Sequence, residues 1–158
     1  MAESRKVVVV GIPGVGKTSL LQKLAEILKD HNKSVSVNSF GSIMFEVAKA
    51  NGIKDRDELR KLPLSEQKNL QKITAEKLAM LTDDVVIIDT HAFINSPEGY
   101  YPGLPEHVLK ILKPSNFVSV SLPLIELFKV FQPHEKERNY ILVFYYRKNK
   151  MYFPFINF

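Results

Sequence analysis

The sequence predicts an α/β fold of three layers (α/β/α), with a central parallel sheet between two layers of helices. Residues 7–10 and 85–88 are continuous apolar runs, VVVV and VVII. Such runs are typical of parallel strands, which are buried on both faces. Segments with helical periodicity separate the expected strands, and this alternation favours a parallel sheet with right-handed crossovers.

Strands and helices are expected to alternate along most of the chain. The first strand, 6–10, leads into a helix at 17–30, in which leucines recur at helical spacing. Residues 140–146 are strong β-formers and predict a fifth strand. Between these segments we expect a strand at 34–40, a helical block at 42–82, a strand at 85–89, a loop at 90–104, a helix at 104–112 and a strand at 116–120.

The helical block is too long for a simple crossover, so we expect it to be an insertion after the second strand. Capping and breaking residues divide it into three pieces. The expected boundaries are Ser42 and Gly52 for the first piece, Asp55 and Pro63 for the second, and Ser65 and about Leu81 for the third.

Length and composition restrict the class of protein. The chain has 158 residues, the length of one domain, so we expect a single domain over residues 1–158. The absence of cysteine excludes disulfides, thiolate metal ligands and cysteine nucleophiles. No apolar run reaches the roughly 18 residues of a membrane span, and no apolar signal segment follows the N-terminal MAESRK. We therefore expect a cytoplasmic protein without a membrane partner.

The net charge of +5 and the isoelectric point near 9.3 raise the question of nucleic acid binding. The basic residues, however, are spread along the chain and mixed with acidic ones. A protein that binds two polyphosphates would also be basic. From charge alone we do not expect nucleic acid as a partner.

Residues 11–18 read GIPGVGKT, the G-x-x-x-x-G-K-T pattern of a phosphate loop. Its glycines let the backbone turn tightly and bring N–H groups close to an anion. Lys17 adds a charge for the β and γ phosphates, and the Thr18 hydroxyl is placed to ligate Mg²⁺. The positive end of the following helix points at the same phosphates. A glycine-rich turn without a ligand would not account for Lys17 followed by Thr18, so the fold is expected to be that of a P-loop NTPase.

The second piece of the helical block carries basic residues, among them Arg56 and Arg60. A guanidinium group can grip phosphate with two hydrogen bonds, so arginines near a phosphate loop suit a second anionic substrate. A solvated helix face is the alternative, and it stays open at this point. The partners that such a face would offer the arginines are Asp55, Asp57 and Glu58.

Five segments, including the phosphate loop, share the order and spacing of one known family. They are GIPGVGKTSL (11–20), NSFGSIMFEVAK (38–49), DRDELRKL (55–62), VVIIDTHAFI (85–94) and PEGYYPGLP (97–105). Together they resemble the archaeal-type adenylate kinases, and the resemblance covers about residues 5–120.

The resemblance implies the reaction ATP + AMP ⇌ 2 ADP, a Mg²⁺-dependent phosphoryl transfer with ATP and AMP as partners, carried out by a homotrimer. Such a transfer needs positioning and charge neutralisation more than a general base. The block at 40–82 would be the helical insertion that binds the nucleoside monophosphate AMP.

The resemblance also implies roles for individual residues. Lys17, Arg56 and Arg60 would be catalytic, with the two arginines at the AMP phosphate. Asp89 would join Thr18 at the magnesium ion, and His91 would be structural or orient a substrate. The residues implied to hold the ATP phosphates are Gly11, Ile12, Pro13, Gly14, Val15, Gly16, Lys17, Thr18 and Ser19.

Residues 121–158 depart from the family pattern. The family continues with an arginine-rich segment that covers ATP, whereas this chain offers only Lys136 and Arg138 there. We count Arg138 among the catalytic candidates. One hypothesis is that a reading-frame change or a truncation produced this segment, and the alternative is a divergent member with a rebuilt lid.

Two rival functions stay open beside adenylate kinase. A kinase for another small acceptor would use the same scaffold, since residue spacing does not identify the acceptor. A non-catalytic nucleotide-binding or RNA-associated protein would account for the basic charge and the altered C-terminal segment. Arg56 and Arg60 distinguish a kinase from a non-catalytic protein. A kinase needs them at the acceptor phosphate, whereas a protein that only binds a nucleotide does not.

Overall fold

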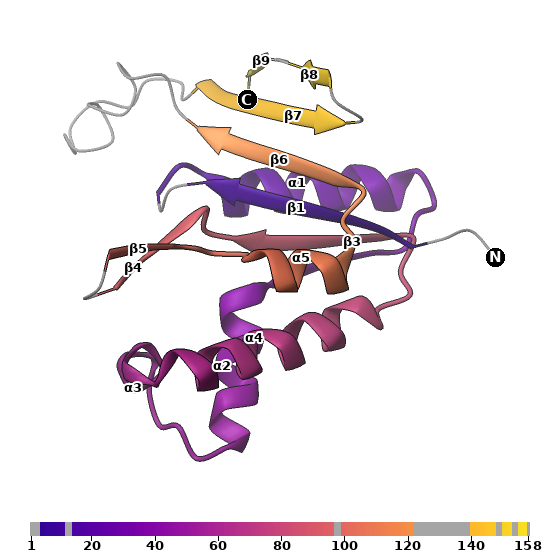
Figure 1. The fold of residues 1–158 in the computed structure, drawn as a ribbon. Coiled ribbons are helices and arrows are strands. Elements are labelled where there is room, and N and C mark those ends of the chain that lie inside the picture. Colours follow the sequence, from indigo (N-terminus) through magenta and orange to yellow (C-terminus); the bar gives the residue numbers. More distant parts are fainter. Residues whose placement is uncertain are drawn as a thin grey trace.

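A largely parallel sheet forms the centre of the fold, as predicted (Figure 1). The computed structural model describes residues 4–11, 14–96, 99–121, 140–147, 150–152 and 155–157. Its parallel strands are β1 (Arg5–Gly11), β2 (Val35–Ser39), β3 (Val85–Thr90) and β6 (Asn116–Ser121). The antiparallel ones are β7 (Tyr140–Arg147), β8 (Lys150–Tyr152) and β9 (Phe155–Asn157). Within the described residues the strand order is β2-β3-β1-β6-β7-β8, and β9 also pairs with β7.

The register of the parallel strands brings their carboxyl ends to one edge. Asp89 of β3 lies opposite Val9 of β1 on one side and opposite Ser39 of β2 on the other. On the far side of β1, Gly11 lies opposite Val120 of β6. The segments that follow these strands therefore meet at the edge where open α/β sheets bind ligands.

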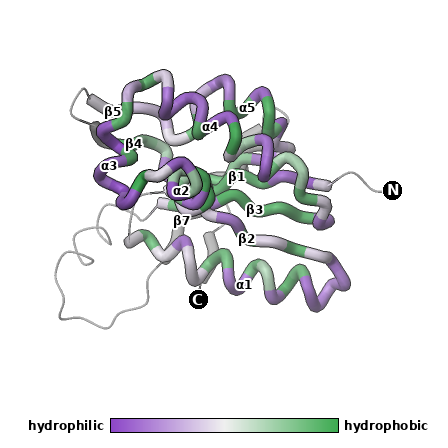
Figure 2. Tube along the Cα trace, turned by 90° about the horizontal axis from the view of Figure 1, so that it is seen from below, coloured by the Kyte–Doolittle hydropathy of each residue, from purple (hydrophilic) through white to green (hydrophobic). Residues whose placement is uncertain are grey.

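Helices cover both faces of the sheet and complete the three predicted layers (Figures 1 and 2). Helix α1 (Lys17–Asp30) covers one face, and α2 (Phe40–Ala50), α4 (Leu64–Ala79) and α5 (Glu106–Leu112) cover the other. Val8 packs in the core with α2, α4 and α5, whereas Val9 packs in the core with α1. Burial on both faces is why residues 7–10 of this strand are all apolar.

The insertion between β2 and β3 is helical in three pieces, as predicted: α2, α3 (Arg56–Lys61) and α4. Helix α3 starts as expected, because the Asp55 carboxylate accepts a hydrogen bond from the Glu58 backbone N–H (2.7 Å). The prediction that Ser42 caps α2 is wrong. Ser39 is the cap, and its hydroxyl accepts a hydrogen bond from the Ser42 N–H (3.4 Å). Strand β2 passes directly into α2, so the last strand residue takes the capping position.

The segment predicted as a loop at 90–104 contains a hairpin, so that prediction is wrong. Strands β4 (Phe93–Ser96) and β5 (Gly99–Pro102) pair antiparallel, with Ile94 opposite Tyr101. Each strand has four residues, and the glycines and prolines of this segment are typical of turns. Strands this short do not show a clear alternation in the sequence.

The fifth strand predicted at 140–146 is confirmed as β7. It pairs antiparallel with β6, with Val143 opposite Val120. Lys136 and Arg138 lie outside the described residues, so their roles stay predictions. Among the helices of the described residues, none has the length and apolar character that crossing a membrane requires.

Replacing Leu78 by alanine should destabilise the fold strongly. Leu78 lies on α4, is 1% exposed and packs in the core with α2 and α5. Emptying such a position typically costs about 2–5 kcal/mol, so the urea midpoint should fall markedly. Met80, which is 79% exposed, is the control, and Met80→Ala should change stability by less than about 0.5 kcal/mol. Equal losses in the two variants would contradict the core described above.

Candidate active site

The phosphate-loop motif joins β1 to α1 in the strand–loop–helix context that its function requires. Gly14 and Gly16 have φ angles of +82° and +87°, which residues with side chains rarely adopt. Gly16 is also the N-cap of α1, and within the described residues this helix end has no side-chain cap. The first N–H groups of α1 are therefore left for another acceptor, and an anion suits the positive end of the helix. Ile12 and Pro13 lie outside the described residues.

Lys17 is buried against the edge of the sheet, with 8% of its side chain exposed. Its ammonium group donates to the Gly11 carbonyl oxygen (3.1 Å) and lies 3.9 Å from the Asp89 carboxylate. Gly11 permits this close packing, because a Cβ atom there would lie 2.6 Å from the Val120 carbonyl oxygen and 3.1 Å from Lys17 Cδ. The structure thus brings three predicted site residues, Gly11, Lys17 and Asp89, to one place.

Asp89 carries a carboxylate that its surroundings only partly satisfy. Its Oδ1 atom is buried and accepts no hydrogen bond within the described part of the chain. Burial raises the pKa of this carboxyl group, and the positive charges of Lys17 and His91 oppose the shift. A buried oxygen without a donor is a position where a cation or a bound water fits.

Metal-binding groups are sparse around this carboxylate. In the described residues, no group of three or more His, Cys, Asp or Glu side chains lies close enough to hold a metal ion. Thr18 and Ser19 are exposed at the start of α1. A hard divalent ion at this edge would therefore depend on the Thr18 hydroxyl, Asp89, water and oxygens of a ligand, a donor set that suits Mg²⁺.

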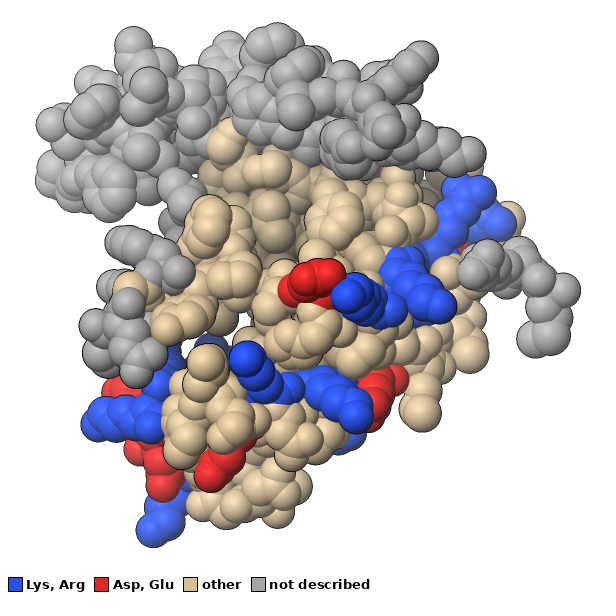
Figure 3. Space-filling model, viewed as in Figure 1, with Lys and Arg blue, Asp and Glu red and all other residues tan. Residues whose placement is uncertain are grey.

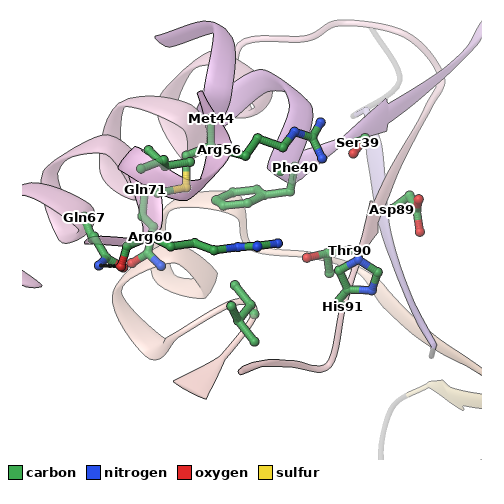
Figure 4. Close-up of a pocket in the computed structure, with 14 residues that line it drawn as sticks. Ser39, Phe40, Met44, Arg56, Arg60, Gln67, Gln71, Asp89, Thr90 and His91 are labelled. Atoms are coloured by element: carbon green, nitrogen blue, oxygen red, sulfur yellow. Dashed lines mark hydrogen bonds between the residues drawn. The ribbon is translucent and has the colours of Figure 1, made fainter. Parts of the chain in front are cut away.

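A cavity of about 190 Å³ lies beside Asp89, and we call it the strand-edge cavity. The predicted residues Arg56, Arg60, Asp89 and His91 all line it. In Figure 4 the guanidinium groups of both arginines point toward the end of β3, with the Phe40 ring between the two side chains in this view.

The sequence left two interpretations of Arg56 and Arg60 open, a phosphate-binding role and a solvated helix face. The structure has features of both. Arg60 pairs with Asp57 (3.1 Å), as the solvated-face reading proposed, but both side chains are more than 60% exposed. Exposed pairs of this kind contribute little to stability. Arg56 donates to the Ser42 hydroxyl (3.2 Å), and its guanidinium lies over the Phe45 ring (5.7 Å). Neither contact keeps the arginines out of the cavity, since both line it.

Sequence reasoning missed several side chains of the strand-edge cavity. On α4, Gln67 and Gln71 are four residues apart and so share a helix face, but polar residues on a helix are more often simply solvated. On α2, apolar residues are expected to serve the core alone. The missed lining residues are Ser39, Phe40, Gly41, Met44, Leu59, Gln67, Gln71, Thr90, Ile94 and Gly103. His91 also approaches the Gly11 carbonyl oxygen, with 3.5 Å to its Nδ1 atom.

A family profile described as an AAA domain matches residues 10–139. The chain belongs to this AAA domain family. The three-layer P-loop fold predicted from sequence is thereby confirmed. Among solved structures, shikimate kinase from Aquifex aeolicus vf5 superposes with a TM-score of 0.46 and 20% identity, over 78% of this chain and 62% of that one.

The predicted resemblance to archaeal adenylate kinases is also confirmed as a similarity. The chain is 45% identical over 120 residues to the adenylate kinase of Methanococcus aeolicus and 43% identical over 120 residues to that of Methanocaldococcus jannaschii. It is 43% identical over 113 residues to that of Saccharolobus solfataricus. The matches cover 75%, 75% and 68% of this chain but only 62%, 62% and 58% of those relatives.

Asp89→Asn should change how stability depends on pH. The pKa of Asp89 is above its ordinary value of 3.8 in the folded chain, so the folded state holds this proton more tightly than the unfolded state. The stability from this linkage is full below about pH 3.8 and is lost as the pH rises through the folded pKa. Because Asp89→Asn has no carboxyl group to titrate at this position, it should not lose this stability as the pH rises. We expect the variant to be at least as stable as wild type in urea at pH 7.

Asp84→Asn is a matched control, because the pKa of Asp84 is shifted in the opposite direction to that of Asp89. The exposed Asp84 carboxylate accepts hydrogen bonds from the Ser34 backbone N–H (3.0 Å) and hydroxyl (3.3 Å), and the backbone bond lowers its pKa most. Its contribution is present above about pH 3.8 and lost as the pH falls through the lower folded pKa. This variant should be less stable than wild type at pH 7. A similar loss in Asp89→Asn would contradict the raised pKa of Asp89.

Proposed function

We propose that the chain catalyses reversible, Mg²⁺-dependent transfer of a phosphoryl group, ATP + AMP ⇌ 2 ADP. One observation carries the proposal: two sets of phosphate-binding groups meet at the same edge of the sheet. Lys17 of the phosphate loop lies 3.9 Å from the Asp89 carboxylate, and Asp89 also lines the cavity that Arg56 and Arg60 line. The similarity to adenylate kinases supports it.

The donor nucleotide ATP would bind at the phosphate loop. The uncapped N–H groups of α1 and the glycines at positive φ suit its phosphates. Lys17 would exchange its hydrogen bond to the Gly11 carbonyl for the β and γ phosphates. Thr18 and Asp89 would hold Mg²⁺, directly or through water, and the ion would supply charge neutralisation on the phosphates.

The acceptor nucleotide AMP would bind in the strand-edge cavity. Arg56 and Arg60 would grip its phosphate, since both line the cavity and point toward the end of β3 (Figure 4). Phe40 and Met44 offer an apolar wall for the base, and the amide of Gln71 offers donors and an acceptor for its edge. Positioning and charge neutralisation suffice for this transfer, so the site needs no catalytic base from the protein.

Several further proposals rest on the similarity to adenylate kinases rather than on the site. We propose that residues 1–158 form a single domain, that the protein is cytoplasmic and that it assembles as a homotrimer. Arg138 would contribute to covering ATP. The mass of the protein in solution, measured by light scattering, tests the homotrimer. A loss of activity in Arg138→Ala would support the role of Arg138.

The charge on the surface supports small nucleotides rather than nucleic acid as partners. Figure 3 shows acidic side chains interspersed with basic ones over the helices of the face in view. Two exposed pairs, Lys110 with Glu106 and Lys72 with Glu76, follow this pattern. Nucleic acid binding usually requires a continuous basic surface.

The direct test is ADP formation by the 158-residue chain from ATP and AMP with Mg²⁺, measured in a coupled assay. Turnover that requires both nucleotides would support the proposal. Turnover with ATP and another acceptor, but not AMP, would assign a different small-molecule kinase. ATP binding without turnover for any acceptor would support the non-catalytic reading.

Lys17→Ala should reduce kcat by about 10²–10³ or more, because it removes a charge that stabilises the transferring phosphates. ATP binding should persist in part through the backbone N–H groups of the loop. Lys23→Ala on the same helix, where Lys23 pairs with Glu26 at the surface, is the control and should leave kcat unchanged. Equal kcat in wild type and Lys17→Ala would remove Lys17 from the site.

Arg60→Ala should raise the KM for AMP by roughly ten-fold or more, since a charge-assisted hydrogen bond to phosphate is lost. The KM for ATP should change little. Lys72→Ala removes a charge from the surface of α4 and should alter neither constant. Unchanged AMP kinetics in Arg60→Ala would place the acceptor phosphate elsewhere.

A further inference from the structure

Two side chains of α2 hold the Arg56 guanidinium. Its Nη2 atom donates a hydrogen bond to the Ser42 hydroxyl oxygen (3.2 Å), and its Cζ atom lies 5.7 Å from the centre of the Phe45 ring. A cation within about 6 Å of a ring centre is attracted by the negative face of the ring. Ser42 and Phe45 are three residues apart on α2, so they share a helix face. One face of α2 therefore restrains the guanidinium through two different contacts.

These two anchors lie outside the strand-edge cavity and on a firmly packed helix. Neither Ser42 nor Phe45 lines the cavity, whereas Arg56 does. No residue of α3, which carries Arg56, is buried. The contacts thus tie a side chain of a weakly packed helix to a helix that is fixed in the core, and they can influence a ligand in the cavity through Arg56. The buried residues of α2 are Phe40, Met44, Val47 and Ala48.

Both anchors are electrically neutral. Among the described residues, no carboxylate forms an ion pair with Arg56, whereas Asp57 pairs with Arg60. A guanidinium carries several N–H donors, and within the described part of the chain the Arg56 side chain uses one of them, toward Ser42. The positive charge of Arg56 is therefore not compensated by a neighbour, and its remaining donors can bind an anion.

We propose that Ser42 and Phe45 are positioning residues. They order the Arg56 guanidinium before a ligand binds, and they leave its charge for the phosphate of the acceptor nucleotide (Figure 4). This inference rests on the proposed function, which assigns that phosphate to Arg56 and Arg60. Ordering a long side chain during binding costs affinity, so a guanidinium that is ordered in advance binds the phosphate more tightly.

The first test measures the order of the Arg56 side chain in the ligand-free chain, from nitrogen NMR relaxation of its Nε–H group. The loss of one signal in Arg56→Lys assigns that group. We expect its order parameter to fall in Phe45→Leu, which removes the ring, and to stay near the wild-type value in Phe45→Tyr, which keeps the ring. An order parameter that Phe45→Leu leaves unchanged would overturn the proposal, whatever reaction the chain catalyses.

The second test measures the Kd for AMP by equilibrium dialysis without ATP. Phe45→Leu should raise this Kd by about two- to ten-fold, the cost of ordering one long side chain, and should leave the Kd for ATP unchanged. Phe45→Tyr should restore AMP binding. In an Arg56→Ala background, Phe45→Leu should have no further effect. A purely structural role for Phe45 would weaken AMP binding to the same extent with or without Arg56, and that result would overturn the proposal.

Ser42→Asp and Ser42→Asn test the neutrality of the anchor. Ser42 is in the first turn of α2, where an acidic side chain favours the helix, so Ser42→Asp should be at least as stable as wild type in urea. Its carboxylate would pair with Arg56 and repel a phosphate, so the Kd for AMP should rise at least about ten-fold. The neutral Ser42→Asn should bind AMP within about three-fold of wild type. AMP binding by Ser42→Asp at the wild-type level would contradict the proposal.

Two further variants complete the design. Lys49 also lies over the Phe45 ring, with 4.7 Å from its Nζ atom to the ring centre, so Lys49→Ala is the matched control and should leave the order of Arg56 unchanged. If Arg56→Ala binds AMP like wild type while the order of Arg56 depends on Phe45, the positioning stands and the acceptor assignment fails. If Arg56→Ala weakens AMP binding and Phe45→Leu does not, the acceptor assignment stands and the proposal is overturned.

Discussion

The parallel pairing of β1 with β3 is the constraint on which the site depends. It sets Asp89 opposite Val9, two residues before the first glycine of the phosphate loop. Pairing of β3 with β2 sets Ser39 beside the same carboxylate, and α2 starts there. A slip of one residue would turn Asp89 to the other face of the sheet and would exchange Ile87 and Ile88 between the two cores. The cores that hold this register therefore also hold the geometry of the site.

The buried charges at this edge are incompletely matched. Lys17 and Asp89 lie 3.9 Å apart, at the limit of an ion pair, and the lysine hydrogen bonds to the Gly11 carbonyl oxygen instead. The Asp89 Oδ1 atom has no donor within the described residues, and burial raises its pKa. Leaving such groups unsatisfied costs stability. A phosphate would pair with Lys17, and a cation would pair with Asp89. The proposed ligands would therefore offset the cost in stability that these unsatisfied groups cause.

Much of this arrangement could be predicted from residues with one dominant physical role. Val7 to Val10 read as a buried strand, and Gly16 with Lys17 read as a helix start that binds phosphate, because few other structures use these residues. The hairpin at 93–102 was not predictable, since its short strands contain Gly99 and Pro102. Gln67 and Gln71 gave no signal either, because a polar residue facing a cavity and one facing solvent look alike in sequence. Ser39 could not be predicted as the N-cap of α2, because that prediction requires knowing that β2 ends at this residue.

Helix α3 carries Arg56 and Arg60 of the strand-edge cavity, and hydrogen bonds hold it together with the packing of one partly buried side chain, Leu59. None of its residues is buried. Its hydrogen bonds include the Asp55 cap, the Arg56 bond to the Ser42 hydroxyl, and the bonds that the Gln67 amide donates to the carbonyl oxygens of Arg60 (3.2 Å) and Leu62 (2.8 Å). An element without buried apolar side chains can shift at low cost while the core stays intact. The two arginines therefore sit on an element that is held less firmly than the core. A ligand that both arginines hold would restrain α3 against the rest of the fold.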